Sequence, residues 1–239
     1  MKQDSTRVQK ILQQIFDQSY AAIGPLHWWP ADTDEEMIIG AVLTQNTAWK
    51  NVEQAIANLR QVGKLTLRAI HATPEEELAQ LIRPTGYFNL KAKRLLSLVR
   101  FFMERCGGDL SCLSRNDPAT LRRKLLEVYG IGPETADSIL LYALKMPIFV
   151  VDAYTRRILS RHGLCSAGAS YEEIQSLFMR KLPHEEKMFN EYHAQLVAIG
   201  NRFCRPHPLC SQCPLFKKEL FVAKKDFNEM VGWVSDPTM

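Results

Sequence analysis

The sequence predicts an all-α protein, and two observations support this fold class. Apolar residues recur three and four positions apart along most of the chain, as in Val8, Ile11, Leu12, Ile15 and Phe16, which is the spacing of one face of a helix. No stretch shows the sustained two-residue alternation of a half-buried strand. We therefore expect nearly the whole chain to be helical.

The further helices follow from the same spacing and from helix-start signals. Two are expected around Ile38 to Val42 and Val52 to Leu59. Pro74 followed by three glutamates favours a helix start, because acidic residues suit the positive end of the helix dipole. Asn89 is the expected N-cap of a helix over Leu90 to Glu104. The remaining helices are expected at Leu121 to Tyr129, Thr135 to Leu144, Ala153 to His162, Tyr171 to Lys181 and Glu185 to Phe203.

The composition is that of an ordinary globular protein. With 239 residues, 46% hydrophobic and 23% charged, the chain can bury a full core in one large or two small domains. No apolar run is long enough to cross a membrane and the N-terminus lacks a signal-peptide core, so we expect a cytoplasmic monomer. A net charge of +4 neither reveals nor opposes a nucleic-acid partner. In that compartment the six cysteines should be reduced or metal-bound.

A short turn, Gly130-Ile131-Gly132, stands between two of the expected helices and is followed, after an apolar stretch, by Asp152. Such a turn can present free backbone amides at a helix N-terminus, where anions bind. A dinucleotide-binding loop is excluded, because no third glycine follows and the segment before the turn is helical in pattern. An ordinary corner between two helices stays open as the alternative reading of the glycines.

Four stretches follow one another along the chain: Ala41 to Thr47, Gly86 to Ala92, the segment around the Gly130-Ile131-Gly132 turn, and Val151 to Tyr154. Together they resemble the endonuclease III family of helix-hairpin-helix (HhH-GPD) DNA glycosylases, over about Glu36 to Cys213. The resemblance implies a six-helix domain over residues 32–146, with the hairpin at about 121–144. A second helical domain would combine residues 1–31 and 147–239, with the active site in the cleft between the two domains.

The branch of the family is indicated by Glu134. Lyase-competent members carry a lysine at the matching hairpin position, and that lysine forms a Schiff base with the sugar; a carboxylate cannot form an imine. Lys91 and Lys145 lie elsewhere in the pattern. We therefore predict a monofunctional glycosylase that uses water, with AP lyase activity absent. Glu134 would contact the base, or it is simply an acidic residue in the first turn of a helix.

Asp152 is the predicted catalytic residue. Breaking the bond between base and sugar builds positive charge on the sugar ring, and a nearby carboxylate stabilises that charge or orients the attacking water. Asp152 is also the expected N-cap of the helix that starts at Ala153. The two roles are compatible, because capping would fix the direction of the carboxylate.

The aromatic residues narrow the substrate. Trp28, Trp29 and Pro30 precede the first matched helix and Trp49 follows it, an arrangement similar to the 3-methyladenine DNA glycosylase branch, which also has glutamate at the hairpin position. That resemblance implies that Trp28 and Trp49 flank the extruded base and that Trp29 and Pro30 help to line its pocket. The alternative is that the tryptophans close the core. An N3- or N7-alkylated purine is already cationic and leaves as a neutral molecule, which agrees with the lack of an evident general acid.

Contacts with DNA are expected from two places. Gln45 occupies the position from which relatives fill the gap left by a flipped base, although a polar residue at a helix end would need no such role. Gly130, Gly132 and Thr135 are the candidates for phosphate contact through main-chain amides and a hydroxyl. The expected partner is double-stranded DNA that contains damaged bases.

The C-terminal cysteines leave the cofactor open. Cys204, Cys210 and Cys213 lie where the family places a [4Fe-4S] cluster, which needs four cysteines in its usual form. Here the first gap has five residues rather than six, and no cysteine follows Cys213; Glu219 stands near the fourth position. A three-cysteine cluster, zinc held together with His207, and a metal-free relic are the alternatives, and the clustering favours metal. Cys106, Cys112 and Cys165 are expected to be structural thiols.

The sequence thus predicts a base excision repair enzyme that flips out and hydrolytically removes alkylated purines such as 3-methyladenine. One alternative is an endonuclease III-like glycosylase for oxidised or mismatched pyrimidines with AP lyase activity. Another is a noncatalytic helix-hairpin-helix DNA-binding module, which would require neither Asp152 nor an aromatic pocket.

Overall fold

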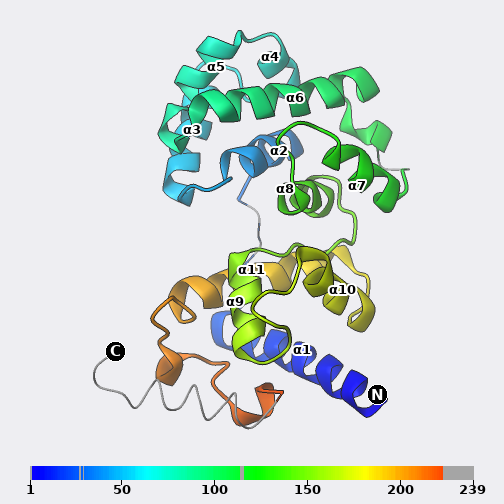
Figure 1. Cartoon of the computed structure of the whole chain (residues 1–239). Coiled ribbons are helices and arrows are strands. Elements are labelled where there is room, and N and C mark those ends of the chain that lie inside the picture. The colour runs from blue at the N-terminus through cyan, green and yellow to red at the C-terminus, as the bar shows by residue number, and fades with distance from the viewer. Residues whose placement is uncertain (1, 27, 29, 114–115, 223–239) are drawn as a thin grey trace. The chain divides into compact units, whose positions relative to one another are not determined.

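The computed structural model of the chain describes residues 2–26, 28, 30–113 and 116–222 (Figure 1). These residues form helices, helical turns and loops and contain no strand, so the predicted all-α fold class is confirmed. Trp29, one of the predicted base-pocket residues, lies outside the described residues. No described helix combines the length and the apolar character that a membrane span requires.

The chain divides into two compact units. The first combines the N-terminal segment up to Trp28 with the chain from Pro147 onward, and the second is the intervening segment up to Met146. The first unit contains α1 (Lys2–Ile23), α9 (Ala153–Arg161), α10 (Tyr171–Lys181) and α11 (Glu186–Arg202), and the second contains α2 to α8.

The second unit is built around α2 (Asp34–Leu43), which is buried from Glu36 to its end. Thr33 begins this helix, because its hydroxyl accepts the backbone N–H of Glu36 at 3.1 Å, as expected of a threonine N-cap. Helix α2 packs against α3 (Trp49–Gln61), α6 (Phe88–Cys106) and α8 (Pro133–Ser138). The remaining helices of this unit are α4 (Leu67–His71), α5 (Glu75–Leu81) and α7 (Pro118–Leu126).

Helices α7 and α8 form the predicted hairpin. Asp117 caps α7 by accepting the backbone N–H of Thr120 at 2.8 Å. Helix α8 begins at Pro133, a residue suited to a first helical turn, and its helical path continues through a π-helical turn, Ile139–Ala143. All five residues of that turn are buried against α2 or its neighbours. The hairpin is therefore anchored to the core of its unit by an apolar helix.

The first unit has an aromatic core between its helices. Phe149 stacks on Phe178 of α10 with ring centroids 3.7 Å apart, and Phe189 and Tyr192 of α11 meet the Phe149 ring edge-on. The hydroxyl of Tyr192 donates to the Leu12 carbonyl in α1 at 2.7 Å. These contacts bring segments from both ends of the chain into one core.

Two local expectations were wrong. Asn89 is not the N-cap of α6: the helix begins at Phe88, and the preceding residue, Tyr87, adopts a left-handed conformation with φ of 45°. A Tyr in that conformation gives no sequence signal, whereas Asn is a common N-cap. Cys106 and Cys112 are not free thiols but form a disulfide; Cys165, Cys204, Cys210 and Cys213 are free.

Candidate functional site

The turn between α7 and α8 requires glycine at Gly130 for two reasons. Its φ is +78°, in the left-handed region that favours glycine, and a Cβ there would lie 2.2 Å from Cγ of Arg94. Gly132, by contrast, is the exposed N-cap of α8, and a Cβ there would meet no atom within 4 Å. The protein's own packing therefore accounts for the first glycine and leaves the second unexplained.

Gln45 joins the end of α2 to this turn. Its side-chain amide donates to the Gly130 carbonyl at 3.1 Å and to the Thr135 hydroxyl at 3.0 Å. Its oxygen accepts a hydrogen bond from Arg94 at 2.7 Å. Three of the four predicted DNA-contacting residues thus lie in one network, in which Thr135 is buried. Gly132 and Asn46, which adjoin this network in the sequence, are exposed.

Glu134 is exposed in the first turn of α8. The two lysines near the matched stretches both donate to backbone carbonyls. Lys91 is buried and donates to the Leu43 and Thr85 carbonyls at 2.8 and 2.9 Å; burial, together with the nearby Arg94, lowers its pKa to about 8. Lys145 donates to the Tyr142 carbonyl and lies 3.7 Å from Asp34. Lys91 therefore caps a helix end rather than adding surface charge for DNA.

Asp152 is the N-cap of α9. Its Oδ1 accepts the backbone N–H of Thr155 at 2.7 Å, and only 12% of its side chain is exposed. A carboxylate anchored through one oxygen in this way keeps a defined direction and leaves its second oxygen for another partner. That second oxygen, Oδ2, lies 3.7 Å from Nε2 of His193 in α11.

His193 was not among the residues selected from the sequence. It is buried, and burial lowers its pKa while the Asp152 carboxylate opposes that shift. It lies far from Asp152 along the chain, and a lone histidine on an apolar helix gives no sequence signal. The neighbouring residues Thr155 and Gln195 are also fully buried polar groups, so Asp152 lies at a locally polar place between two packed helices.

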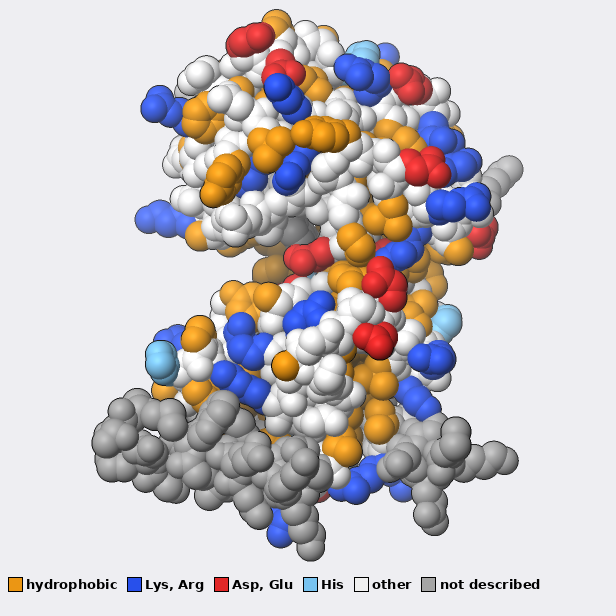
Figure 2. All heavy atoms as spheres, in the orientation of Figure 1, with side chains coloured by type: hydrophobic (Ala, Val, Ile, Leu, Met, Phe, Trp, Pro, Cys, Tyr) orange, Lys and Arg blue, Asp and Glu red, His pale blue; other side chains and the backbone are white. Residues whose placement is uncertain are grey.

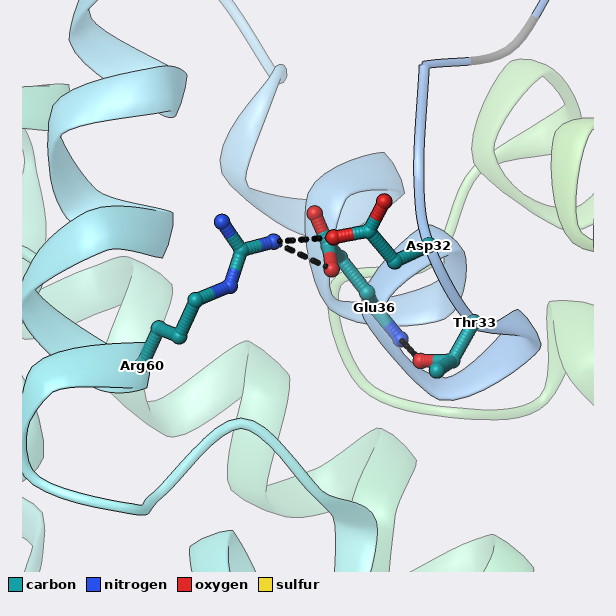
Figure 3. Close-up of polar contacts among 4 residues, drawn as sticks. All are labelled: Asp32, Thr33, Glu36 and Arg60. Atoms are coloured by element: carbon teal, nitrogen blue, oxygen red, sulfur yellow. Dashed lines mark hydrogen bonds and ion pairs between the residues drawn. The ribbon is translucent and has the colours of Figure 1, made fainter.

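A pocket of about 230 Å³ opens in the second unit. It includes two predicted base-pocket residues, Pro30 and Trp49, together with three carboxylates and one arginine. Arg60 donates to Asp32 at 2.9 Å and to Glu36 at 2.8 Å, and Figure 3 shows both carboxylates turned toward it. The Trp49 indole donates to the carboxylate of Glu53 at 2.9 Å. The residues lining the pocket are Pro30, Asp32, Glu36, Gly40, Trp49, Glu53, Ile56 and Arg60.

Trp28, the other predicted flanking residue, belongs to the first unit and is partly buried. Surface charge adds little to the location of a DNA-binding face. On the face shown in Figure 2, Lys and Arg side chains alternate with acidic and apolar ones within each unit. Charge on this face therefore does not locate a DNA-binding surface.

Three free cysteines of the first unit, Cys204, Cys210 and Cys213, line one cavity. Arg161 reaches into this group with Nη1 3.2 Å from the Cys204 sulfur, and burial raises the pKa of Cys213 to about 12. The proposed additional ligands, His207 and Glu219, are exposed and do not line the cavity. Within residues 2–222, so far as they are described, no three His, Cys, Asp or Glu side chains are placed to hold a metal. The donors present do not fit a four-ligand cluster.

The chain is similar to known DNA repair proteins. Residues 39–184 match the model of the HhH-GPD superfamily base excision DNA repair proteins. A Methanocaldococcus jannaschii protein named as a DNA repair glycosylase is 46% identical over 202 residues, which cover 84% of this chain and 91% of that one. Endonuclease III of Thermotoga maritima is 31% identical over 178 residues, covering 74% and 78% of the two chains.

Solved structures show the same fold. The H. pylori 3-methyladenine DNA glycosylase, bound to 1,N6-ethenoadenine, superposes with a TM-score of 0.70 at 26% identity, over 82% of this chain and 97% of that one. A trapped endonuclease III–DNA covalent intermediate superposes with a TM-score of 0.77 at 22% identity, over 93% and 98% of the two chains.

Proposed function

The chain belongs to the HhH-GPD superfamily of base excision DNA repair proteins, and we propose that it is a monofunctional DNA glycosylase that removes alkylated purines with water as the nucleophile. The observation that carries the proposal is the anchored carboxylate of Asp152, accompanied by a glutamate where a Schiff-base lysine would stand. The partner of this reaction is double-stranded DNA with a damaged base.

Asp152 supplies the charge that the reaction needs. As the bond between the base and the sugar breaks, positive charge develops on the sugar ring, and a fixed negative group lowers the energy of that transition state without having to reorganise. The hydrogen bond from Thr155 and the low exposure of Asp152 provide the fixed direction. The same carboxylate can orient the water that attacks the sugar.

Glu134 supports the choice of water over an amine. It carries no nucleophilic nitrogen, and Lys91 and Lys145 are held by carbonyl groups of their own unit. An enzyme arranged in this way releases the base and leaves the abasic strand intact.

The pocket beside Trp49 supports an alkylated purine as the substrate. Its charged lining residues are Asp32, Glu36, Glu53 and Arg60, so it has an excess of negative charge, which suits a cationic base and repels a phosphate. Stacking of a base on an aromatic ring contributes about 1 to 3 kcal/mol, comparable to the few kcal/mol that base extrusion costs. The similarity to the H. pylori 3-methyladenine glycosylase points the same way.

The first test is base release from a panel of duplexes that carry 3-methyladenine, 7-methylguanine, thymine glycol or a G·T mismatch. We expect the wild-type protein to release the methylated purines, and Asp152→Asn to lower the single-turnover rate by about 100-fold or more. Asparagine is an equally good N-cap, so this variant should keep its thermal midpoint. Preferred release of thymine glycol or thymine would instead assign the chain to the endonuclease III-like alternative, and binding without any release would make it a DNA-binding module.

Borohydride trapping tests the use of water. A Schiff base between protein and sugar is reduced to a stable covalent adduct, so endonuclease III serves as the positive control. We expect no adduct for this chain under conditions in which it releases its base. An adduct on denaturing gels would contradict the assignment of Glu134 and identify an amine elsewhere in the chain as the nucleophile.

A further inference from the structure

The second oxygen of Asp152 faces a residue that the proposed chemistry does not yet use. Oδ1 is held by the backbone of α9, its own helix, whereas Oδ2 lies 3.7 Å from Nε2 of His193 in α11. The side chains of Asp152 and His193 are 12% and 6% exposed. The carboxylate is therefore fixed from two helices that belong to different stretches of the chain.

Close packing of α9 on α11 sets this distance. A Cβ on Gly200 would come within 2.3 Å of the Tyr154 ring, so α11 approaches α9 closely only because residue 200 is glycine. Arg157 of α9 donates to the Cys204 and Gly200 carbonyls at 2.6 and 3.4 Å. These contacts join the same two helices that carry Asp152 and His193, and they leave the pair little freedom to separate.

The charge state of His193 also matters to Asp152. Burial disfavours an imidazolium and lowers the pKa of His193, although the carboxylate favours the charged form. A neutral ring beside Oδ2 can donate an N–H without cancelling the negative charge. A permanent cation at the same place would form an ion pair and would weaken the field that Asp152 directs at the sugar.

A contact of 3.7 Å between Oδ2 and Nε2 is longer than a formed hydrogen bond. Contacts of catalytic groups are often long in the free enzyme and shorten when the substrate is bound. The single hydrogen bond to Thr155 does not prevent rotation of the carboxylate about its Cβ–Cγ bond. Contact of the imidazole ring with Oδ2 restricts that rotation.

We propose that His193 is a positioning residue for Asp152, which directs the carboxylate toward the sugar through a neutral N–H while preserving its negative charge. The inference rests on the catalytic role of Asp152 in the proposed function and is independent of which base is removed. The sequence motifs assign the reaction only to residues of α9 and the hairpin. This inference adds a residue of α11.

The test compares binding to two abasic-site duplexes, one with a cationic pyrrolidine in place of the sugar and one with neutral tetrahydrofuran. The ratio of the two affinities measures how strongly the carboxylate stabilises a positive charge at the position of the sugar. A glutamine in place of His193 would present its amide N–H near the position of Nε2, whereas an asparagine is too short to do so. We expect His193→Gln to keep the wild-type ratio within about threefold, and His193→Asn to lower it about tenfold, as a misplacement of about 1 Å can do.

Binding to the tetrahydrofuran duplex and the thermal midpoint report folding, and the two His193 variants serve as each other's control because both bury an amide. The single-turnover rate should fall in parallel with the ratio, with little change in DNA affinity. Equal ratios in the two variants would overturn the positioning role. If Asp152→Asn kept the wild-type affinity ratio, the catalytic role of Asp152 in the proposed function would fail as well. If Asp152→Asn strongly lowered the ratio while the two His193 variants did not differ, only the positioning role of His193 would be removed.

Discussion

At the scale of single residues, the hydrogen bond from the Trp49 indole to Glu53 bears on the proposed preference for a cationic base. A carboxylate that accepts the indole N–H increases the electron density of the ring, and the negative face of the ring attracts cations. The two residues are four positions apart on α3 and line the same pocket. Glu53 is exposed in the free protein, so its effect should grow when a base displaces water from the pocket.

We predict that Glu53→Gln lowers the preference for a cationic base by about fivefold, an amount within the range of an individual cation–π contact. The change keeps an acceptor for the indole and removes only the charge. The measurement is the ratio of single-turnover release rates for 7-methylguanine and 1,N6-ethenoadenine. Glu104→Gln is the matched control, because Glu104 is exposed on α6 of the same unit and outside the pocket. An unchanged ratio in Glu53→Gln would rule out this electrostatic selection.

The residue scale also shows where sequence reasoning reaches its limit. Asp152 could be selected because it follows the hairpin at a recognisable distance and begins a helix, and the structure places it as the N-cap of α9. His193 could not, because only the packing of α11 on α9 brings it to the carboxylate. Likewise, Arg60 forms ion pairs with Asp32 and Glu36, and the spacing of these residues in the sequence does not predict them.

At the scale of elements, the two glycines of the hairpin turn should respond differently to substitution. We predict that Gly130→Ala lowers the thermal midpoint by several degrees, because the new Cβ overlaps Arg94 and alanine disfavours the left-handed φ of this position. Gly132→Ala should leave the midpoint nearly unchanged, since its Cβ meets nothing in the protein. If DNA phosphate approaches the turn, Gly132→Ala should still weaken binding to an undamaged duplex severalfold. The checks are thermal melting and fluorescence anisotropy, and unchanged DNA binding by a folded Gly132→Ala would remove this residue from the phosphate contact.

Most helices could be predicted because apolar spacing and capping residues agree with each other. Tyr171–Lys181 is one such case, where Ser170 and Glu173 form a capping box. The expectation for Asn89 failed because α6 begins after a residue in a left-handed conformation, which local propensity does not favour. Cys106 and Cys112 form a disulfide, although free thiols were expected. That expectation rested on the expected cellular compartment and not on the distance between the two residues.

At the scale of the whole molecule, the predicted site residues are divided between the two units of the chain. Asp152 and Trp28 belong to the first unit, which also contains His193, whereas Gln45, the hairpin, Glu134 and Trp49 belong to the second. The chain passes from one unit to the other near Trp28 and again near Pro147. Substitutions that destabilise either unit should therefore reduce activity without touching any reacting group, which is why the variants of the hairpin, Asp152 and His193 are paired with a measurement of folding.

Acid should destabilise the first unit through its buried histidines. Burial lowers the pKa of His162 to about 4, and its Nδ1–H donates to the Leu220 carbonyl at 2.9 Å; burial lowers the pKa of His193 as well. A histidine whose pKa is lower in the folded than in the unfolded chain binds fewer protons when folded. Its stabilising contribution is therefore complete above about pH 6.5 and is lost as the pH falls toward about 4.

For His162 the loss should be on the order of 3 kcal/mol across that interval. The measurement is the free energy of urea unfolding at about pH 7.5, 6 and 5. His162→Phe should flatten the dependence, because a phenyl ring can keep the stacking on Phe221, whose centroid lies 4.3 Å from the imidazole, and has no proton to bind. His71→Gln, at an exposed position on α4, should retain the wild-type slope. A wild-type stability that does not fall between about pH 6.5 and 5 would mean that His162 becomes protonated without leaving its place beside Leu220.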